Sequence, residues 1–249
     1  MPEVIRQLPE NVANQIAAGE VIQRPASAVK ELMENAVDAG ASRIDVRVVD
    51  AGRTLIHVMD NGVGMVEADA KRCFDRHATS KITSADDLFT IVSKGFRGEA
   101  LASIASIAHV ELKTRHASDD CGMQLNMEGG TLAQDTPVAM EVGTQIAVRH
   151  LFFNVPARRN FLKSDAVEMR HVVDEFQRVA FAHPGISFVL THQGASLFQL
   201  KPGTLRQRIV GILGPKHDER LVPVQENTDV VTIEQIIHSL VRLILTLLG

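Results

Sequence analysis

The sequence predicts an α+β fold, an α/β sandwich in which helices cover one face of a largely antiparallel or mixed sheet. Two observations lead to this fold class. Segments with helical and with strand periodicity are intermixed along the 249-residue chain, and a regular alternation of strand, helix and strand is missing. Apolar residues make up 45% of the chain and charged residues 22%, enough for a globular core, so the composition excludes a disordered chain.

The first part of the chain carries the clearest helix and hairpin signals. Pro25 suits the first position of a helix, and Gly40 suits a helix stop. Two runs with alternating apolar residues flank the turn at residues 50–52, which is typical of a β-hairpin. The elements expected here are helices at 11–22, 25–39 and 67–76 and strands at 43–49 and 54–59.

Farther along, a polar stretch at residues 77–87 favours a loop or lid, because Thr, Ser and Asp side chains compete for backbone hydrogen bonds. A domain boundary is expected near residues 201–203, with a first domain at 1–204 and an incomplete second one at 205–249. The elements expected between the loop and this boundary are helices at 100–108 and 165–182 and strands at 109–115, 123–127, 145–150 and 186–191.

Charge and cysteine content limit the class of protein. The 26 Lys and Arg against 30 Asp and Glu give a net charge of −4, which argues against a basic coat for nucleic acid over the whole surface. Only the small basic group at Arg158, Arg159 and Lys163 is a candidate, either for nucleic-acid contact or for an ordinary solvated surface. Two cysteines and no export signal predict a cytoplasmic protein. The apolar run at 236–248 is short of the roughly 20 residues of a membrane span, so no membrane contact is expected.

One face of the helix at 25–39 is acidic. At about 100° per residue, Glu31, Glu34, Asn35 and Asp38 form one stripe with no cation among them, and apolar residues form the opposite stripe. One interpretation is a solvated acidic face. The other is a magnesium site in which Asn35 is a ligand and Glu31 activates water, with Glu34 and Asp38 unassigned.

Two glycine-containing turns are candidates for ligand contact. Residues 60–64, DNGVG, end a predicted strand, where glycines let the backbone approach a ligand and Asp60 can accept a hydrogen bond from an exocyclic amine. The same sequence also makes an ordinary tight turn. Residues 95–99, GFRGE, precede a helix and are either a phosphate cradle or a helix cap. No P-loop, dinucleotide-binding GxGxxG turn, zinc motif or hydrolase serine elbow is present.

Five motifs in order give the chain a specific resemblance. They read NQIAAGEVIQRPASAVKELMENAVDAGA, DNGVGM, RHATSKI, GFRGEALASI and GTQIAVRHLFFNVPARRNFL. Together they resemble the N-terminal region of the MutL family of DNA mismatch repair proteins, over roughly residues 1–205. This family is part of the GHKL ATPase superfamily.

The resemblance implies a Bergerat-type ATP-binding sandwich with ATP and Mg²⁺ as cofactors. In that fold Glu31 corresponds to the general base, Asn35 to the magnesium ligand and Asp60 to the adenine-reading acid. The other cofactor-binding positions that it implies are Gly62, Gly64, Ala78, Thr79, Ser80, Lys81, Gly95, Phe96, Arg97, Gly98, Glu99, Ala100, Leu101 and Thr144.

The same resemblance implies a slow molecular switch of mismatch repair. ATP closes a lid and drives dimerisation of N-terminal domains, which signals to mismatch-recognition and downstream repair proteins, with weak DNA contact and no nuclease region. The loop at 152–159 is expected to help shape the lid. Residues 205–249 resemble a truncated ribosomal-S5-like domain that lacks a phosphate-contacting lysine, with its closing helix at 234–249. The alternative is therefore a nucleotide-binding fragment with little turnover.

Overall fold

The computed structural model describes residues 6–79, 98–227 and 232–238. Its α-helices are α1 (Glu10–Val21), α2 (Pro25–Asp38), α3 (Glu67–Arg72), α4 (Ala100–Ser106), α5 (Pro156–Phe161), α6 (Asp165–Ala182) and α7 (Leu205–Leu213). Its strands are β1 (Arg43–Val49), β2 (Leu55–Asp60), β3 (His109–Arg115), β4 (Gly122–Glu128), β5 (Thr131–Val138), β6 (Gly143–Arg149), β7 (Ser187–His192), β8 (Ala195–Leu200), β9 (Leu221–Asn227) and β10 (Thr232–His238). Among the described residues, two short 3-10 helices lie at Asp50–Gly52 and Pro215–Arg220.

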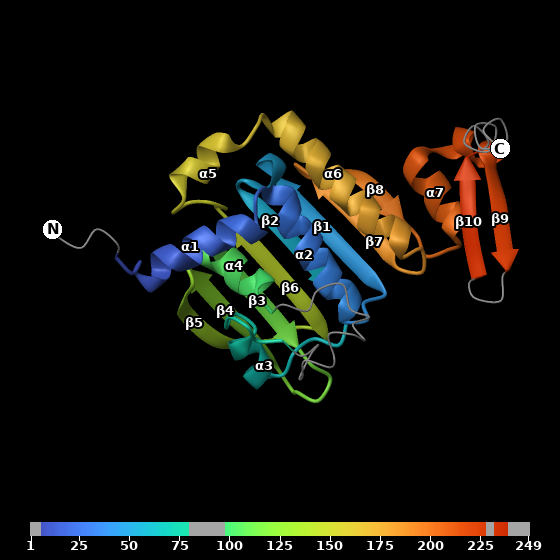
Figure 1. The fold of residues 1–249 in the computed structure, drawn as a ribbon. Helices are drawn as coiled ribbons and strands as arrows, with labels where there is room; N and C mark the ends of the chain where they lie inside the picture. Colours follow the sequence, from blue (N-terminus) through green and yellow to red (C-terminus); the bar gives the residue numbers. More distant parts are fainter. Residues whose placement is uncertain (1–5, 80–97, 228–231, 239–249) are drawn as a thin grey trace.

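An eight-stranded sheet organises the molecule, in the order β5-β4-β3-β6-β2-β1-β7-β8. Its neighbouring strands are antiparallel except β1 and β7, which pair in parallel, so the sheet is mixed. Helices α1, α2, α4 and α6 lie together on one face of it (Figure 1). The predicted α+β sandwich is thereby confirmed.

The core lies between the sheet and these helices. Along β1, Ile44, Val46 and Val48 are buried while the residues between them are partly or fully exposed, so one face of the strand packs inward. Helix α2 buries a stripe toward this face and packs against α6, where Phe176 meets Phe188 of β7 edge to face at 6.0 Å. Burial of these stripes holds α2 firmly against the sheet, which fixes the side chains on its other face.

The expected elements agree with the structure except at several ends. The β1–β2 hairpin and α6 are confirmed, whereas α3 ends at Arg72 and α4 at Ser106, both earlier than predicted. Strands β5 and β8 and helix α5 were not predicted from the sequence. Strand β5 is a mostly exposed edge strand, and α5 has no buried residue, so neither carries a periodic apolar signal.

The segment after the expected boundary begins with α7, whose Thr204 and Gln207 form a capping box. Arg208 of α7 is buried and donates to the carbonyls of Pro184, Ile186 and Lys201, which ties α7 to the sheet domain. Beyond α7, β9 and β10 form an antiparallel pair set apart from the large sheet (Figure 1).

The expected closing helix at 234–249 is wrong over residues 234–238. These residues belong to β10, where backbone pairing with β9 replaces helical bonding, and the remainder lies outside the described residues. The division into domains at 204 and 205 stays a prediction. Within the described ranges, no helix is both long and apolar enough to cross a bilayer.

Candidate functional site

The candidate site is built where the end of α2 meets the turn that follows β2. The N–H of Val63 donates to the carbonyl of Ala39 at 3.0 Å, which joins the turn to the helix end. Asn61 strengthens the junction, because its Oδ1 accepts the backbone N–H groups of Ser42 and Arg43 at 3.0 and 2.8 Å. The turn at 60–64 is therefore held in one position relative to α2 and β1.

Glycines in this turn lie against the backbone of neighbouring strands. A Cβ on Gly62 would lie 2.6 Å from the carbonyl oxygen of Ala39, and one on Gly64 would lie 2.0 Å from that of Arg115. Gly64 also has a φ of 67°, a left-handed conformation that side chains rarely adopt. Backbone atoms of neighbouring segments thus lie where a side chain at either position would go. Contact of Gly62 and Gly64 with a ligand stays a prediction.

Asp60 is the last residue of β2 and pairs in register with Thr144 of β6. Its Oδ1 accepts the N–H of Gly62 at 2.8 Å. Burial raises the pKa of Asp60 to about 6, although the backbone N–H groups of Gly62 and Thr144 oppose that rise. At neutral pH the site therefore presents a half-buried carboxylate, a strong acceptor for an N–H donor.

A buried hydroxyl pair lies next to Asp60, and sequence reasoning found one of its two members. Thr114 Oγ1 lies 3.1 Å from Thr144 Oγ1, donates toward the carbonyl of Gly143 at 3.2 Å and accepts the N–H of Met65 at 2.9 Å. Thr114 was missed. The available signal was a Thr at the third inward position of β3, where Val110 and Leu112 are apolar.

The acidic stripe of α2 includes a cation, contrary to the prediction. Lys30 Nζ lies 3.3 Å from Glu31 Oε1 and 3.2 Å from Glu34 Oε2. Burial lowers the pKa of Lys30, but the two carboxylates outweigh that cause and the net pKa is raised. The helical wheel missed this contact because a lysine side chain is long enough to reach past its own angular position.

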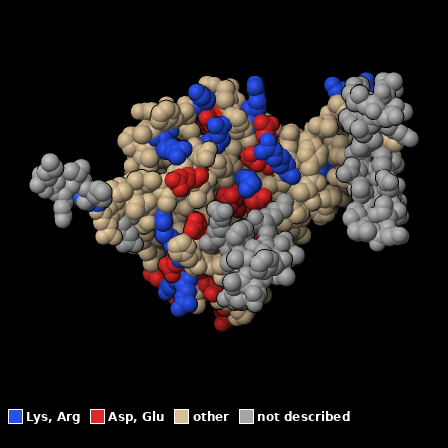
Figure 2. Space-filling view, in the orientation of Figure 1, with Lys and Arg blue, Asp and Glu red and all other residues tan. Residues whose placement is uncertain are grey.

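Figure 2 shows that acidic side chains gather over α2. The side chains of Glu31 and Glu34 are 26% and 13% exposed, so they are partly withdrawn from solvent. Asn35 lies on the same stripe one turn after Glu31 and is half-buried. The stripe thus combines ordered carboxylates with an amide, on the helix that ends at the Asp60 turn.

The structure brings the segments before and after residues 80–97 together. A Cβ on Gly98, whose φ is 61°, would lie 2.4 Å from the carbonyl oxygen of Ala78. His77 Nδ1 lies 3.2 Å from Glu99 Oε1. The predicted positions Ala78, Thr79, Gly98, Glu99, Ala100 and Leu101 are described, and Ser80, Lys81, Gly95, Phe96 and Arg97 lie outside the described residues.

No group of three or more His, Cys, Asp or Glu side chains in the described part of the chain is arranged to hold a metal ion. An amide such as Asn35 is therefore a fitting ligand only for a cation that takes most of its oxygens from elsewhere, as Mg²⁺ does from phosphates and water.

Comparisons with known proteins agree with this arrangement. The family described as histidine kinase-, DNA gyrase B- and HSP90-like ATPase matches residues 23–147. The DNA mismatch repair protein MutL of Christiangramia forsetii is 59% identical over 94% of the chain, and that of Flavobacterium johnsoniae is 57% identical over 94%. The chain spans 38% and 36% of the lengths of these relatives.

Solved structures extend the comparison to the fold. The Aquifex aeolicus MutL ATPase domain complexed with ADP superposes with a TM-score of 0.65 at 30% identity, covering 83% of this chain and 73% of that one. The family match at residues 23–147 contains both α2 and the Asp60 turn.

Proposed function

Because the chain belongs to the N-terminal ATPase region of the MutL family, within the histidine kinase-, DNA gyrase B- and HSP90-like ATPases, we propose that it binds ATP at the Asp60 turn and hydrolyses it slowly. The observation that carries this proposal is the half-buried carboxylate of Asp60. This carboxylate accepts the backbone N–H groups of Gly62 and Thr144.

Adenine recognition is assigned to Asp60. Its ionised carboxylate accepts the N6 amine of adenine, and guanine offers a carbonyl oxygen at the corresponding position, which a carboxylate repels. Thr144, paired with Asp60 across the β2–β6 ladder, assists recognition through its hydroxyl. Gly62 and Gly64 act indirectly, because they let the turn pack tightly enough to hold Asp60 in place.

Hydrolysis is assigned to Glu31. A carboxylate of this kind polarises the attacking water, and most of the remaining catalysis is positioning and electrostatic stabilisation. Lys30 holds Glu31 and Glu34 on the helix surface, which restricts the conformations available to the base. Lys30 thus has a positioning role in this scheme.

Asn35 is the residue assigned to hold Mg²⁺ on the triphosphate. Its neutral amide oxygen is the kind of ligand that Mg²⁺ uses alongside phosphate oxygens and water, and the ion supplies neutralisation of phosphate charge. The phosphates themselves are assigned to residues 78–81 and 95–101, whose described ends meet at Ala78 and Gly98.

The wider role follows from the family. We assign the chain to a cytoplasmic switch of mismatch repair, in which ATP closes the lid and drives dimerisation of N-terminal domains that then engage repair proteins and contact DNA weakly. Binding energy that closes a lid and a dimer, followed by hydrolysis that releases them, is a two-state element biased by ligand. The residues at 152–159 are assigned to shaping the lid.

Steady-state hydrolysis of MgATP tests the proposal, with calorimetry of ATP binding on the same samples. Glu31→Ala is expected to lower turnover at least about 100-fold, since a positioned general base contributes 10²–10⁴-fold, while ATP binding is retained. Glu175→Ala is the matched control, because it removes a carboxylate of α6 that is ion-paired with Arg178 and has no role assigned in the site. Unchanged turnover in Glu31→Ala, or binding without turnover in the parent chain, would contradict the assignment.

A further inference from the structure

Three polar side chains form one row across the sheet, on the face that the helices cover. Asp60 of β2 is in register with Thr144 of β6, and Thr144 is in register with Thr114 of β3. On the other side of Asp60 the row continues with buried apolar side chains, Ile44 of β1 and Phe188 of β7. The row therefore changes from apolar to polar at Asp60, where the proposed nucleotide site lies.

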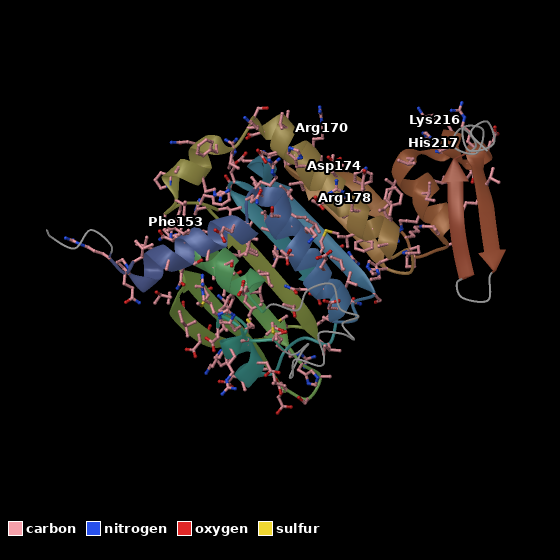
Figure 3. The ribbon with its side chains drawn as sticks, in the orientation of Figure 1. Phe153, Arg170, Asp174, Arg178, Lys216 and His217 are labelled. Carbon is pink, nitrogen blue, oxygen red and sulfur yellow. The ribbon has the colours of Figure 1, made fainter. Side chains whose placement is uncertain are left out.

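Polar side chains are uncommon in this buried layer of the molecule. Thr114 is 1% exposed and Thr144 is 8% exposed. Helix α6, which covers the sheet, keeps Arg170, Asp174 and Arg178 on its exposed face (Figure 3). A hydroxyl group withdrawn this far from water needs hydrogen-bond partners in the protein or on a ligand, so the contacts of the two threonines decide what they can do.

The hydrogen bonds of Thr114 account for its whole hydroxyl group. A hydroxyl has one proton to donate and two lone pairs that accept. The proton of Thr114 is directed at the carbonyl oxygen of Gly143, which can only accept, at 3.2 Å. One lone pair accepts the N–H of Met65 at 2.9 Å, and the other faces Thr144 Oγ1 at 3.1 Å. In this arrangement Thr114 accepts from Thr144.

The direction of this contact fixes the role of the Thr144 hydroxyl. With its single proton donated to Thr114, Thr144 Oγ1 has only lone pairs left to offer. The opposite direction, in which Thr114 donates to Thr144, would take the proton away from the Gly143 carbonyl and leave one lone pair of Thr114 unused. The first arrangement satisfies more buried groups, so it is the more stable of the two.

Asp60 offers further acceptors beside Thr144. Its carboxylate accepts the backbone N–H groups of Gly62 and Thr144, and both hydrogen bonds favour its charged form. The side chains of Asp60 and Thr144 together therefore present only acceptors. An amine matches such an edge, whereas a carbonyl oxygen would be left without a donor.

We propose that Thr114 is a positioning residue for adenine recognition. It holds the proton of the Thr144 hydroxyl away from the nucleotide, so that Thr144 and Asp60 form an acceptor-only edge for the N6 amine. Thr114 acts through Thr144 and has no contact with the nucleotide assigned to it. The inference rests on the proposed function, because it assumes that ATP binds at the Asp60 turn.

The test compares ATP with purine riboside triphosphate, which carries hydrogen in place of the N6 amine. Both are titrated calorimetrically into the parent chain and into Thr114→Val. Valine resembles threonine in shape but has no hydroxyl, so the Thr144 proton is free to turn toward the base. We expect Thr114→Val to lower the affinity for ATP about five- to tenfold and to leave the affinity for the amine-free nucleotide nearly unchanged.

Two controls separate this role from a general effect on the sheet. Thr114→Ser keeps the hydroxyl and is expected to keep the preference for ATP. Thr191→Val makes the same replacement on β7, three strands away from β6 in the sheet, and is expected to change neither affinity.

The kinetic readout is the split between KM and kcat. In Thr114→Val, KM for ATP is expected to rise while kcat stays near the parent value, because the proposed base Glu31 is untouched. Thr114 also accepts the N–H of Met65, so the valine variant can lose stability. If it fails to fold, Thr114→Cys replaces it, because a thiol accepts hydrogen bonds weakly, and the preference for ATP is then expected to fall about two- to threefold.

The alternative outcomes are distinct. Equal losses of affinity for the two nucleotides in Thr114→Val would overturn the inference and assign Thr114 to the packing of the turn through Met65. An unchanged preference for ATP in a folded Thr114 variant without the hydroxyl would also overturn it. A parent chain that binds both nucleotides equally would contradict adenine recognition at Asp60 itself, and the inference would fall with it.

Discussion

The two ends of α2 are built in opposite ways. At the C-terminal end, the turn at 60–64 packs backbone against backbone, and Gly62 and Gly64 leave no room for even a methyl group. At the N-terminal end, a cavity of about 370 Å³ remains beside Arg24, with a buried oxygen of Glu168 unpaired among the described residues. A helix held tightly at one end can position a carboxylate such as Asp60, whereas the open end imposes no such constraint.

A substitution in the turn at 60–64, at the tightly packed C-terminal end of α2, is expected to have the largest effect on stability. Gly64→Ala places a Cβ 2.0 Å from the carbonyl oxygen of Arg115 in a left-handed conformation, and we expect it to lower the free energy of unfolding by about 3–5 kcal/mol. Gly40→Ala is the control, since Gly40 has a φ of 71° with nothing within 4 Å, and backbone strain alone costs about 1 kcal/mol. Urea unfolding followed by circular dichroism measures both. Similar losses in the two variants would mean that the close packing at Gly64 is unimportant.

The variants Gly64→Ala and Gly40→Ala also test whether packing of the turn at 60–64 affects nucleotide binding. If Gly64 acts by holding Asp60 in place, Gly64→Ala protein that still folds in the cold should bind ATP more weakly than Gly40→Ala protein. Calorimetry at low temperature provides the measurement. Equal affinities would separate the packing of the turn from nucleotide recognition.

A substitution of Lys30, in the middle of α2, is expected to have an intermediate effect, on the rate of ATP hydrolysis. Lys30→Met removes the ion pairs to Glu31 and Glu34, which frees the proposed base, and we expect kcat to fall about tenfold with KM nearly unchanged. Lys30→Arg should restore most of the activity, because a guanidinium can reach the same carboxylates. A larger rise in KM than fall in kcat would assign Lys30 to substrate binding instead.

The smallest expected effect is a pH dependence of stability. The pKa of Asp60 is raised from 3.8 to about 6, so the folded chain retains a proton that the unfolded chain has released between those values. The contribution of Asp60 to the free energy of unfolding therefore falls as pH rises from 3.8 to 6. Asp60→Asn has no such fall, because its side chain does not titrate. We expect the variant to gain about 1–2 kcal/mol relative to the parent above pH 6, after allowance for partial solvent access.

Urea unfolding at a series of pH values checks this prediction. Circular dichroism is the suitable signal because the chain contains neither Trp nor Tyr. A constant difference between parent and variant across this pH range would show that Asp60 does not titrate near 6.

Much of the sheet domain could be predicted because its elements carry strong local signals. Pro25 and Gly40 fix the ends of α2, and alternation at Ile44, Val46 and Val48 identifies β1. Strand β5 could not be found in this way, because it lies at an exposed edge and is defined by pairing with β4. Residues 234–238 have an apolar pattern that suits a helix or a strand, and pairing with β9 decides between them.

The residues of the candidate site come from sequence motifs and their roles stay predictions, whereas the contacts that hold them were not predicted. Glu31, Asn35 and Asp60 stand in recognisable motifs, whereas the ion pairs of Lys30 and the hydroxyl contact of Thr114 depend on side-chain reach and on strand register. The cavity beside Glu168 had no sequence signal, because its walls come from residues more than 130 positions apart, Arg24 and Arg158 among them.

The most direct test of the central claim is calorimetric titration of the parent chain and Asp60→Asn with ATP and with GTP. The account predicts that Asp60→Asn loses at least about tenfold in affinity for ATP, since the acceptor of the N6 amine has become an amide that can also present a donor. Affinity for GTP should change little or improve, because the new amide can donate to the guanine carbonyl. An equal loss for both nucleotides, or no loss for ATP, would contradict adenine recognition at the tight end of α2.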